Sequence, residues 1–254
     1  MKPRVLLSAV GIALLSASSS FAQQKPGVVA ALEFQTPKNG MVKQYEDGRK
    51  QKAAWHKEQK DPQPLLVWQI QSGDSTGTYI VGRLDQHWAD FDKPAISDAA
   101  DLEAYNKLVG ASVQSIVTRY YEYLPKVSAP PDSPGPAKFA EIVTFHVRPG
   151  KAGDFRSALE RANEAMVKTK WGVKALWYSL VSGGSTGTFV LVLPHATWAD
   201  FEDKPDTKPF SEMLKDAFGA SEAESLTNRF DSAIDAETSE IIEFRPDLSY
   251  LPSK

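Results

Sequence analysis

The chain alternates short runs of apolar and polar residues with stretches in which apolar residues recur every three or four positions. In the second half, runs rich in β-branched residues predict strands at 141–147, 175–181, 188–193 and about 239–244. Between the first two runs, Phe155, Leu159 and Met166 fall on one face of a predicted helix. The second and third strands are joined by a short Ser-Gly turn, which predicts a hairpin.

Two further helices are predicted before the last strand. An apolar stripe over 210–217 forms one helix face, and Gly219 ends it. Ser221 and Glu224 then have the spacing of a capping box, which predicts a second helix that continues to Ile234.

The first half of the chain shows the same order of elements. The predicted strands lie near 29–34, 65–71, 78–84 and 117–123, and the helices lie near 41–57 and 101–112. Both halves therefore have the order β-α-β-β-α-β, which is typical of the ferredoxin-like fold.

Sequence segments that recur at a fixed offset indicate that the chain consists of two equivalent halves. Residues 72–79 return 110 positions later as 182–189, and Trp88-Ala89-Asp90-Phe91 returns at the same offset as Trp198-Ala199-Asp200-Phe201. The last strands match at an offset of 121, so the second half carries 11 additional residues of helix before its last strand. A repeat of this length indicates a duplicated domain, since solenoid units are much shorter.

These patterns predict an α+β protein in which two tandem ferredoxin-like repeats pack sheet to sheet as an intramolecular dimeric α+β barrel. Strand 175–181 is apolar on both faces, so the face not covered by helices must also be buried. We expect the repeats to span 23–128 and 138–254, with a linker at 129–137 between them. This segment is rich in proline, which is incompatible with a helix or the interior of a sheet.

Residues 1–22 are typical of a secretory signal peptide. Lys2 and Arg4 precede an apolar run, and small residues lead to a cleavage site after Ala22. The run is too short to span a bilayer, so we expect a periplasmic or secreted protein that has no membrane anchor after cleavage. Removal of this segment leaves 27 basic and 32 acidic residues, a balance that does not favour nucleic acid as a partner. The chain has no cysteine, which excludes disulfides and thiolate chemistry.

Two sequence segments of the chain resemble segments of known proteins. Val143-Thr144-Phe145-His146-Val147-Arg148-Pro149-Gly150-Lys151 is similar to the opening of NIPSNAP-like and antibiotic-biosynthesis-monooxygenase-like domains, and so is the Gly-Thr-aromatic strand that leads to Trp-Ala-Asp-Phe. The resemblance implies the dimeric α+β barrel superfamily. Members of that superfamily include cofactor-independent monooxygenases, haem-handling proteins and proteins without a known activity, so the fold alone does not transfer a function.

His146 is the sharpest candidate for chemistry because it is a lone imidazole in a predicted strand. It has the chemistry of a general base, a haem ligand or a hydrogen-bond donor, and the alternative is an ordinary strand histidine. We expect Phe34 or Gln35 at the equivalent position of the first repeat, so any such chemistry would belong to one half of the chain.

The remaining candidates are aromatic or basic residues on predicted strands, where they either line a ligand cavity or fill the core. They are Trp68, Trp177, Tyr178, Tyr121 and Arg119. Aromatic walls suit flat apolar ligands, and an arginine orients a carboxylate or phenolate. The repeated Trp88 and Trp198 are better explained as structural anchors, with the following aspartates at helix N-termini. The scattered charges of 43–60 fit a solvated helix face, and no motif or spacing predicts a metal site.

The sequence therefore favours an exported barrel that binds a small, largely apolar or aromatic molecule, with no catalytic machinery identified and no cofactor indicated. The alternative is a cofactor-independent monooxygenase or haem-handling enzyme that uses His146, Arg119 and Tyr178. Because the two repeats can cover each other, we expect a monomer or a weak homodimer.

Overall fold

The computed structural model describes residues 28–132, 135–202 and 207–252. The predicted signal peptide at 1–22 lies outside this part of the chain. Among the described residues, no helix has the length and apolarity that crossing a membrane requires.

Each half of the chain forms four strands with helices on one side. The first half consists of β1 (Val29–Pro37), α1 (Val42–Glu58), β2 (Leu66–Ile70), β3 (Tyr79–Gln86), α2 (Asp98–Leu108) and β4 (Val113–Tyr123). The second half consists of β5 (Phe139–Val147), α3 (Ala152–Thr169), β6 (Leu176–Ser182), β7 (Thr188–His195), α4 (Phe210–Phe218), α5 (Ala220–Ala233) and β8 (Ile234–Phe244). Short 3-10 helices η1 (Trp88–Asp92), η2 (Gly110–Ser112), η3 (Pro125–Val127) and η4 (Trp198–Phe201) lie between them.

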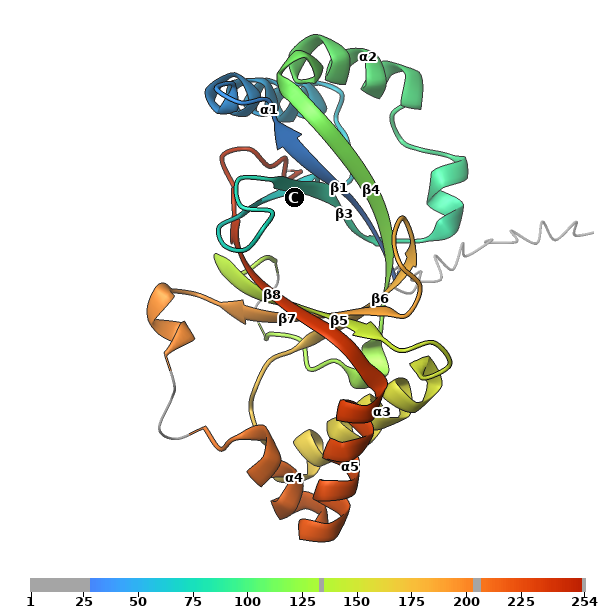
Figure 1. The fold of residues 1–254 in the computed structure, drawn as a ribbon. Helices are drawn as coiled ribbons and strands as arrows, with labels where there is room; N and C mark the ends of the chain where they lie inside the picture. The colour runs from blue at the N-terminus through green and yellow to red at the C-terminus, as the bar shows by residue number, and fades with distance from the viewer. Residues whose placement is uncertain (1–27, 133–134, 203–206, 253–254) are drawn as a thin grey trace, which may run out of the picture.

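The eight strands close into one antiparallel barrel in the order β1-β3-β2-β8-β5-β7-β6-β4. The halves join at their edges, where β2 pairs with β8 and β4 pairs with β6. Figure 1 shows the helices of the first half above the barrel and those of the second half below it. The predicted α+β barrel is thus confirmed, with the two sheets curving around a shared interior.

Several predicted element boundaries are wrong. α5 begins at Ala220 after Gly219, so Ser221 lies inside the helix and forms no capping box; Ile234 begins β8. Strands β4 and β8 also begin earlier than predicted, at Val113 and Ile234. Their first residues are largely exposed on both faces, so they lack the alternation that marks a half-buried strand.

The core has three parts. On the helix side of the first half, Tyr45 of α1 packs against Val67, Tyr79 and Val81. On the helix side of the second half, Phe155 of α3 packs against strand residues and against α5, and a further cluster joins α3 to α4 and α5. The third part lies inside the barrel, where two clusters have five partly buried residues in common.

The charged stretch of α1 is a solvated face only in part. Lys43, Lys50 and Lys57 are exposed, as expected for 43–60. Arg49, Lys52 and His56, by contrast, are 3 %, 1 % and 1 % exposed. These residues lie beneath α2 and the loop after α1. The sequence pattern of α1 alone does not predict that these segments cover it.

Candidate functional site

The barrel interior is lined by alternate residues of the eight strands. The two interior clusters share five members, one or more from each of β1, β3, β5 and β7: Leu32, Phe34, Leu84, Ile142 and Val192. These side chains face the barrel and are nevertheless only partly buried. Part of their surface therefore remains accessible, which a ligand site requires.

Arg119 brings a positive charge into this apolar lining. Its strand position pairs with Leu32, an interior residue, and its guanidinium carbon lies 4.6 Å from the centre of the Phe34 ring. The Arg119 Nε is buried and has no hydrogen-bond partner. A buried donor without a partner carries a desolvation penalty, which an anionic or carbonyl ligand would relieve.

Tyr121 lies two residues further along the same face and is 7 % exposed. Burial raises the pKa of its phenol, hydrogen bonding to Arg119 opposes the rise, and the charge of Glu240 adds to it. Glu240 of β8 also lies beside the hairpin glycine Gly73. At the offset of 121, Glu240 is the counterpart of Arg119, so the two halves present opposite charges toward the same tyrosine.

Two other predicted residues also lie in the barrel. Trp68 is 9 % exposed and its ring centre is 5.9 Å from that of Phe244. Tyr178 packs against the cluster that contains Tyr121, and its ring centre is 5.4 Å from that of Tyr123. Burial raises the pKa of the Tyr178 phenol, which therefore stays protonated and can donate a hydrogen bond.

Trp177 is on the opposite face of its strand from Tyr178. It belongs to the helix-side cluster, with its ring centre 5.6 Å from that of Phe145 and 6.2 Å from that of Phe155. Adjacent strand residues alternate faces, so Trp177 and Tyr178 cannot both line the barrel.

His146 lies near the end of β5, where it pairs with Thr188 and Ala236 on the neighbouring strands. Its Nδ1 is 3.3 Å from the Thr188 hydroxyl oxygen. The equivalent residue of the first half is Thr36, which contacts Thr78 in the same way, so the expectation of Phe34 or Gln35 is wrong. The structure thus groups Arg119 with Tyr121 and places His146 in a separate contact at the strand end.

A haem would need an axial ligand beside a flat apolar slot. In the described part of the chain His146 is the histidine on the barrel-facing side, but its paired neighbours are a threonine and an alanine. The residues present therefore do not fit a haem. Within the same described ranges, no group of three acidic or histidine side chains is placed to hold a metal ion.

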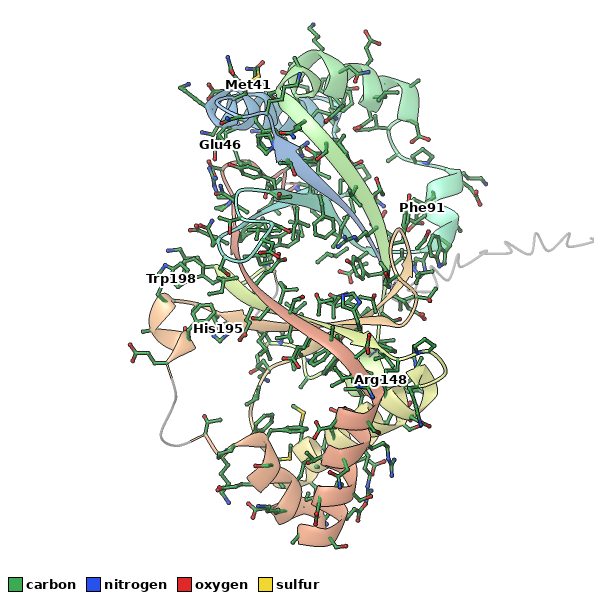
Figure 2. All side chains as sticks on the ribbon, in the orientation of Figure 1. Met41, Glu46, Phe91, Arg148, His195 and Trp198 are labelled. Atoms are coloured by element: carbon green, nitrogen blue, oxygen red, sulfur yellow. The ribbon has the colours of Figure 1, made fainter. Side chains whose placement is uncertain are left out.

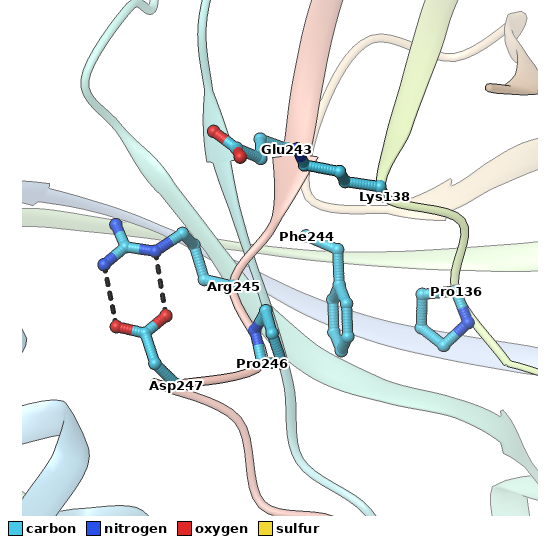
Figure 3. A pocket seen from close by; sticks show the side chains of 7 residues that line it. All are labelled: Pro136, Lys138, Glu243, Phe244, Arg245, Pro246 and Asp247. Carbon is cyan, nitrogen blue, oxygen red and sulfur yellow. Dashed lines mark hydrogen bonds and ion pairs between the residues drawn. The ribbon is translucent and has the colours of Figure 1, made fainter. Parts of the chain in front are cut away.

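The structure also contains a cavity of about 400 Å³ outside the predicted site. Figure 3 shows it at the end of β8, between Pro136, Lys138, Phe244 and Arg245. Arg245 is held by Asp247 through two hydrogen bonds of 3.0 Å and by Glu46 through one of 2.6 Å. These contacts occupy its guanidinium, so the cavity has no unpaired arginine to offer a ligand.

A second charged cluster, which the sequence did not indicate, lies between α1 and α2. His56 contacts Asp61 through Nδ1 at 2.8 Å and Lys52 through Nε2 at 3.0 Å. Lys52 continues to Asp101 at 2.7 Å, and Arg83 also binds Asp61 at 2.8 Å. Burial lowers the pKa of His56 to about 4, so the ring is neutral, with Nδ1 donating to Asp61 and Nε2 accepting from Lys52.

Most of this cluster is buried, although the Asp101 side chain at its edge is 42 % exposed, and it has the character of a structural network. The Lys52 and His56 side chains are 2 % and 1 % exposed, and the Tyr250 ring stacks on the imidazole. Tyr250 also donates a hydrogen bond of 2.7 Å to the Asp61 carbonyl, which ties the C-terminal segment to the first half.

The repeated Trp-Ala-Asp-Phe motifs form η1 and η4 on opposite sides of the barrel (Figure 2). Asp90 and Asp200 accept hydrogen bonds from backbone N–H groups at the start of each helix, as predicted. The tryptophans pack on neighbouring aromatic rings but remain 52 % and 54 % exposed. They therefore anchor the short helices only in part.

The fold is shared with solved structures of very different sequence. A putative monooxygenase from Lactobacillus acidophilus has a TM-score of 0.50 at 11 % identity, with 89 % of this chain and 97 % of that chain covered. An anthrone oxidase-like protein has a TM-score of 0.52 at 12 % identity, with 91 % and 95 % covered. No family model matches the chain, and no relative is found among curated proteins. Together with the topology, these similarities define a dimeric α+β barrel fold. At this level of sequence identity they do not define an activity.

Proposed function

We propose that the chain is an exported binding protein whose barrel holds a small, largely apolar or aromatic molecule with one anionic group. The observation that carries the proposal is the buried, unpartnered Nε of Arg119 within the apolar interior. A carboxylate, phenolate or enolate would supply the missing acceptor and neutralise the guanidinium.

The surrounding rings fit the rest of such a molecule. Phe34 already lies against the Arg119 guanidinium, and Trp68 and Tyr178 belong to the same interior. Flat aromatic surfaces favour a flat apolar ligand, and a protonated tyrosine adds a directional hydrogen bond.

The binding proposal is tested by calorimetry with 1-naphthoate and its neutral analogue 1-naphthamide. We expect naphthoate to bind more tightly, and Arg119→Leu to weaken it at least about tenfold while leaving naphthamide nearly unchanged. Arg148→Leu is the matched control, since Arg148 is half exposed and pairs with Asp235 on the outside. Equal affinity of the two ligands, or no effect of Arg119→Leu, would refute the proposal.

Export is tested separately. Fractionation followed by intact mass measurement should find the protein outside the cytoplasm with Gln23 as its first residue. A cytoplasmic protein that retains residues 1–22 would contradict this part of the proposal.

A second function is favoured by Arg119 and Tyr121 acting on one oxygen atom. A guanidinium beside a phenol stabilises an enolate or phenolate, and such carbanion-like species react directly with O₂. In that reaction an activated CH₂ group and O₂ would give a ketone and water, as the name of the anthrone oxidase-like neighbour suggests for its own substrate. His146 would be the candidate base.

An oxygen electrode with anthrone as the probe distinguishes this function from simple binding. Oxygen uptake that falls in Arg119→Leu and in His146→Ala, but not in Arg148→Leu, would support the enzyme. Uptake no faster than without protein would leave the binding function alone.

A further inference from the structure

The repeated hairpin lies against a charged strand residue in each half of the chain. In the first half, a Cβ at Gly73 would lie 3.1 Å from Cγ and 3.4 Å from Oε1 of Glu240. In the second half, a Cβ at Gly183 would clash with the Thr118 carbonyl oxygen and lie 2.9 Å from Cα of Arg119. Glycine therefore lets both hairpins approach the neighbouring strand closely, beside its charged residue.

Arg119 and Glu240 lie on opposite sides of the barrel interior. Their strands, β4 and β8, are four places apart in the closed order of eight strands. Arg119 pairs with Leu32 of β1, and Glu240 pairs with Ile142 of β5. Because Leu32 and Ile142 are interior residues, their cross-strand partners face the interior as well. Leu32 and Ile142 are also equivalent at the offset of 110, so the two charges occupy equivalent positions of the two halves.

No side chain in the described part of the chain neutralises either charge. The ion pairs of the described residues include neither Arg119 nor Glu240. The neighbouring Ile241 N–H donates to the Ser72 hydroxyl, but no donor of the described chain reaches the Glu240 carboxylate. Both charged residues are half-buried. Because such charges are less well solvated than in water, a ligand group that pairs with them is bound more strongly.

Tyr121 shows that the two charges act on the same part of the interior. Burial raises the pKa of its phenol, Arg119 lowers it, and the charge of Glu240 raises it further. An eight-stranded barrel is just wide enough to be filled by side chains or to hold one small ligand. A ligand whose anion is held by Arg119 therefore extends across the barrel toward Glu240.

We propose that Glu240 determines ligand specificity by accepting a hydrogen bond from a hydroxyl group at the end of the ligand opposite its anion. The inference rests on the proposed function, because Arg119 must hold the anion for the other end of the ligand to meet Glu240. The ligand class is thereby narrowed from apolar anions to hydroxylated aromatic acids.

The chemistry of a carboxylate and of its surroundings favours a hydroxyl group. An ionised carboxylate only accepts hydrogen bonds, so the ligand must supply the donor. A neutral hydroxyl suits the apolar interior better than an ammonium group, whose burial costs more desolvation. A second anionic group is disfavoured, because it would meet the negative charge of Glu240.

Calorimetry with 5-hydroxy-1-naphthoate and 5-methoxy-1-naphthoate tests the role of Glu240, because the methoxy compound lacks the donor. We expect wild type to bind the hydroxy compound at least about tenfold more tightly. Glu240→Leu should remove this preference and should tighten the binding of unsubstituted 1-naphthoate, whose anion then no longer shares the barrel with a carboxylate. Glu237→Leu is the matched control and should keep the preference, since exposed Glu237 pairs with Phe145 on the helix side of the sheet.

The outcomes separate this inference from the proposed function. Binding of 1-naphthoate that does not depend on Arg119 would overturn both. Binding that depends on Arg119, with equal affinities of wild type for the hydroxy and methoxy compounds, would overturn only the role of Glu240. A preference that persists in a Glu240→Leu variant with an unchanged circular dichroism spectrum would also overturn that role. If Glu240→Leu does not fold, the comparison of the two compounds on wild type decides the question.

Discussion

The neutral, buried His56 makes the stability of the fold depend on pH. Burial, together with the charges of Lys52 and Arg83, lowers the pKa of His56 to about 4 against the opposing effect of Asp101 and Asp61. The unfolded chain has an ordinary imidazole with a pKa of about 6.5. As the pH falls through this window, the unfolded state takes up a proton that the folded state does not bind, so the free energy of unfolding decreases.

The size of the effect follows from the difference between the two pKa values. The stabilisation is fully present above about pH 6.5 and declines until the folded ring is protonated near pH 4. Between about pH 7.5 and about pH 5, this single group removes on the order of 2 kcal/mol from the free energy of unfolding.

Urea unfolding at a series of pH values measures this loss, and His56→Asn isolates it. The asparagine amide can still donate to Asp61 but does not titrate. We expect the variant to be less stable at neutral pH and to lose about 2 kcal/mol less than wild type on acidification. Other titrating groups contribute to both proteins and cancel in the comparison. Parallel pH profiles of the two proteins would refute the reasoning.

Three further outcomes are expected. Gly48→Ala should lower the melting temperature by the equivalent of about 1–3 kcal/mol, because its Cβ would lie 2.1 Å from the Leu108 carbonyl oxygen; an unchanged value in calorimetry would contradict the close α1–α2 contact. Phe155→Ala should cost about 3–5 kcal/mol in urea unfolding, since the fully buried ring packs against four other aromatic rings, and a loss under about 1 kcal/mol would argue against this core. Burial raises the pKa of Tyr45 and Tyr178, so an absorbance titration should show both ionising only when the chain unfolds; ionisation together with exposed tyrosines would contradict their placement.

The fold could be predicted because the local sequence patterns that specify its strands and helices occur twice in the chain. The repeated hairpin at 72–79 and 182–189 marks equivalent strands, and these strands fall at equivalent places in the barrel. The starts of β4 and β8 escaped prediction because a strand exposed on both faces has no apolar alternation to recognise.

The site was only partly predictable, because strand register decides which face each residue occupies. Arg119, Tyr121, Tyr178 and Trp68 lie in the barrel, whereas Trp177 lies on the helix side. Glu240 was missed, although comparing the last strands at an offset of 121 would have placed it opposite Arg119.

The charged network around His56 was not predictable from local sequence at all. Lys52 and His56 have the spacing of an ordinary exposed helix face. Their burial depends on Asp101, Arg83 and Tyr250, which lie far away along the chain and meet α1 only in the folded barrel.

The central claim is that the barrel interior binds an apolar anion through Arg119. A crystal structure of the protein soaked with 1-naphthoate tests it most directly. The account predicts the carboxylate within hydrogen-bonding distance of the Arg119 Nε, with the rings against Phe34 and Trp68. Naphthoate bound only outside the barrel, or an interior closed around Arg119 with no ligand, would contradict it.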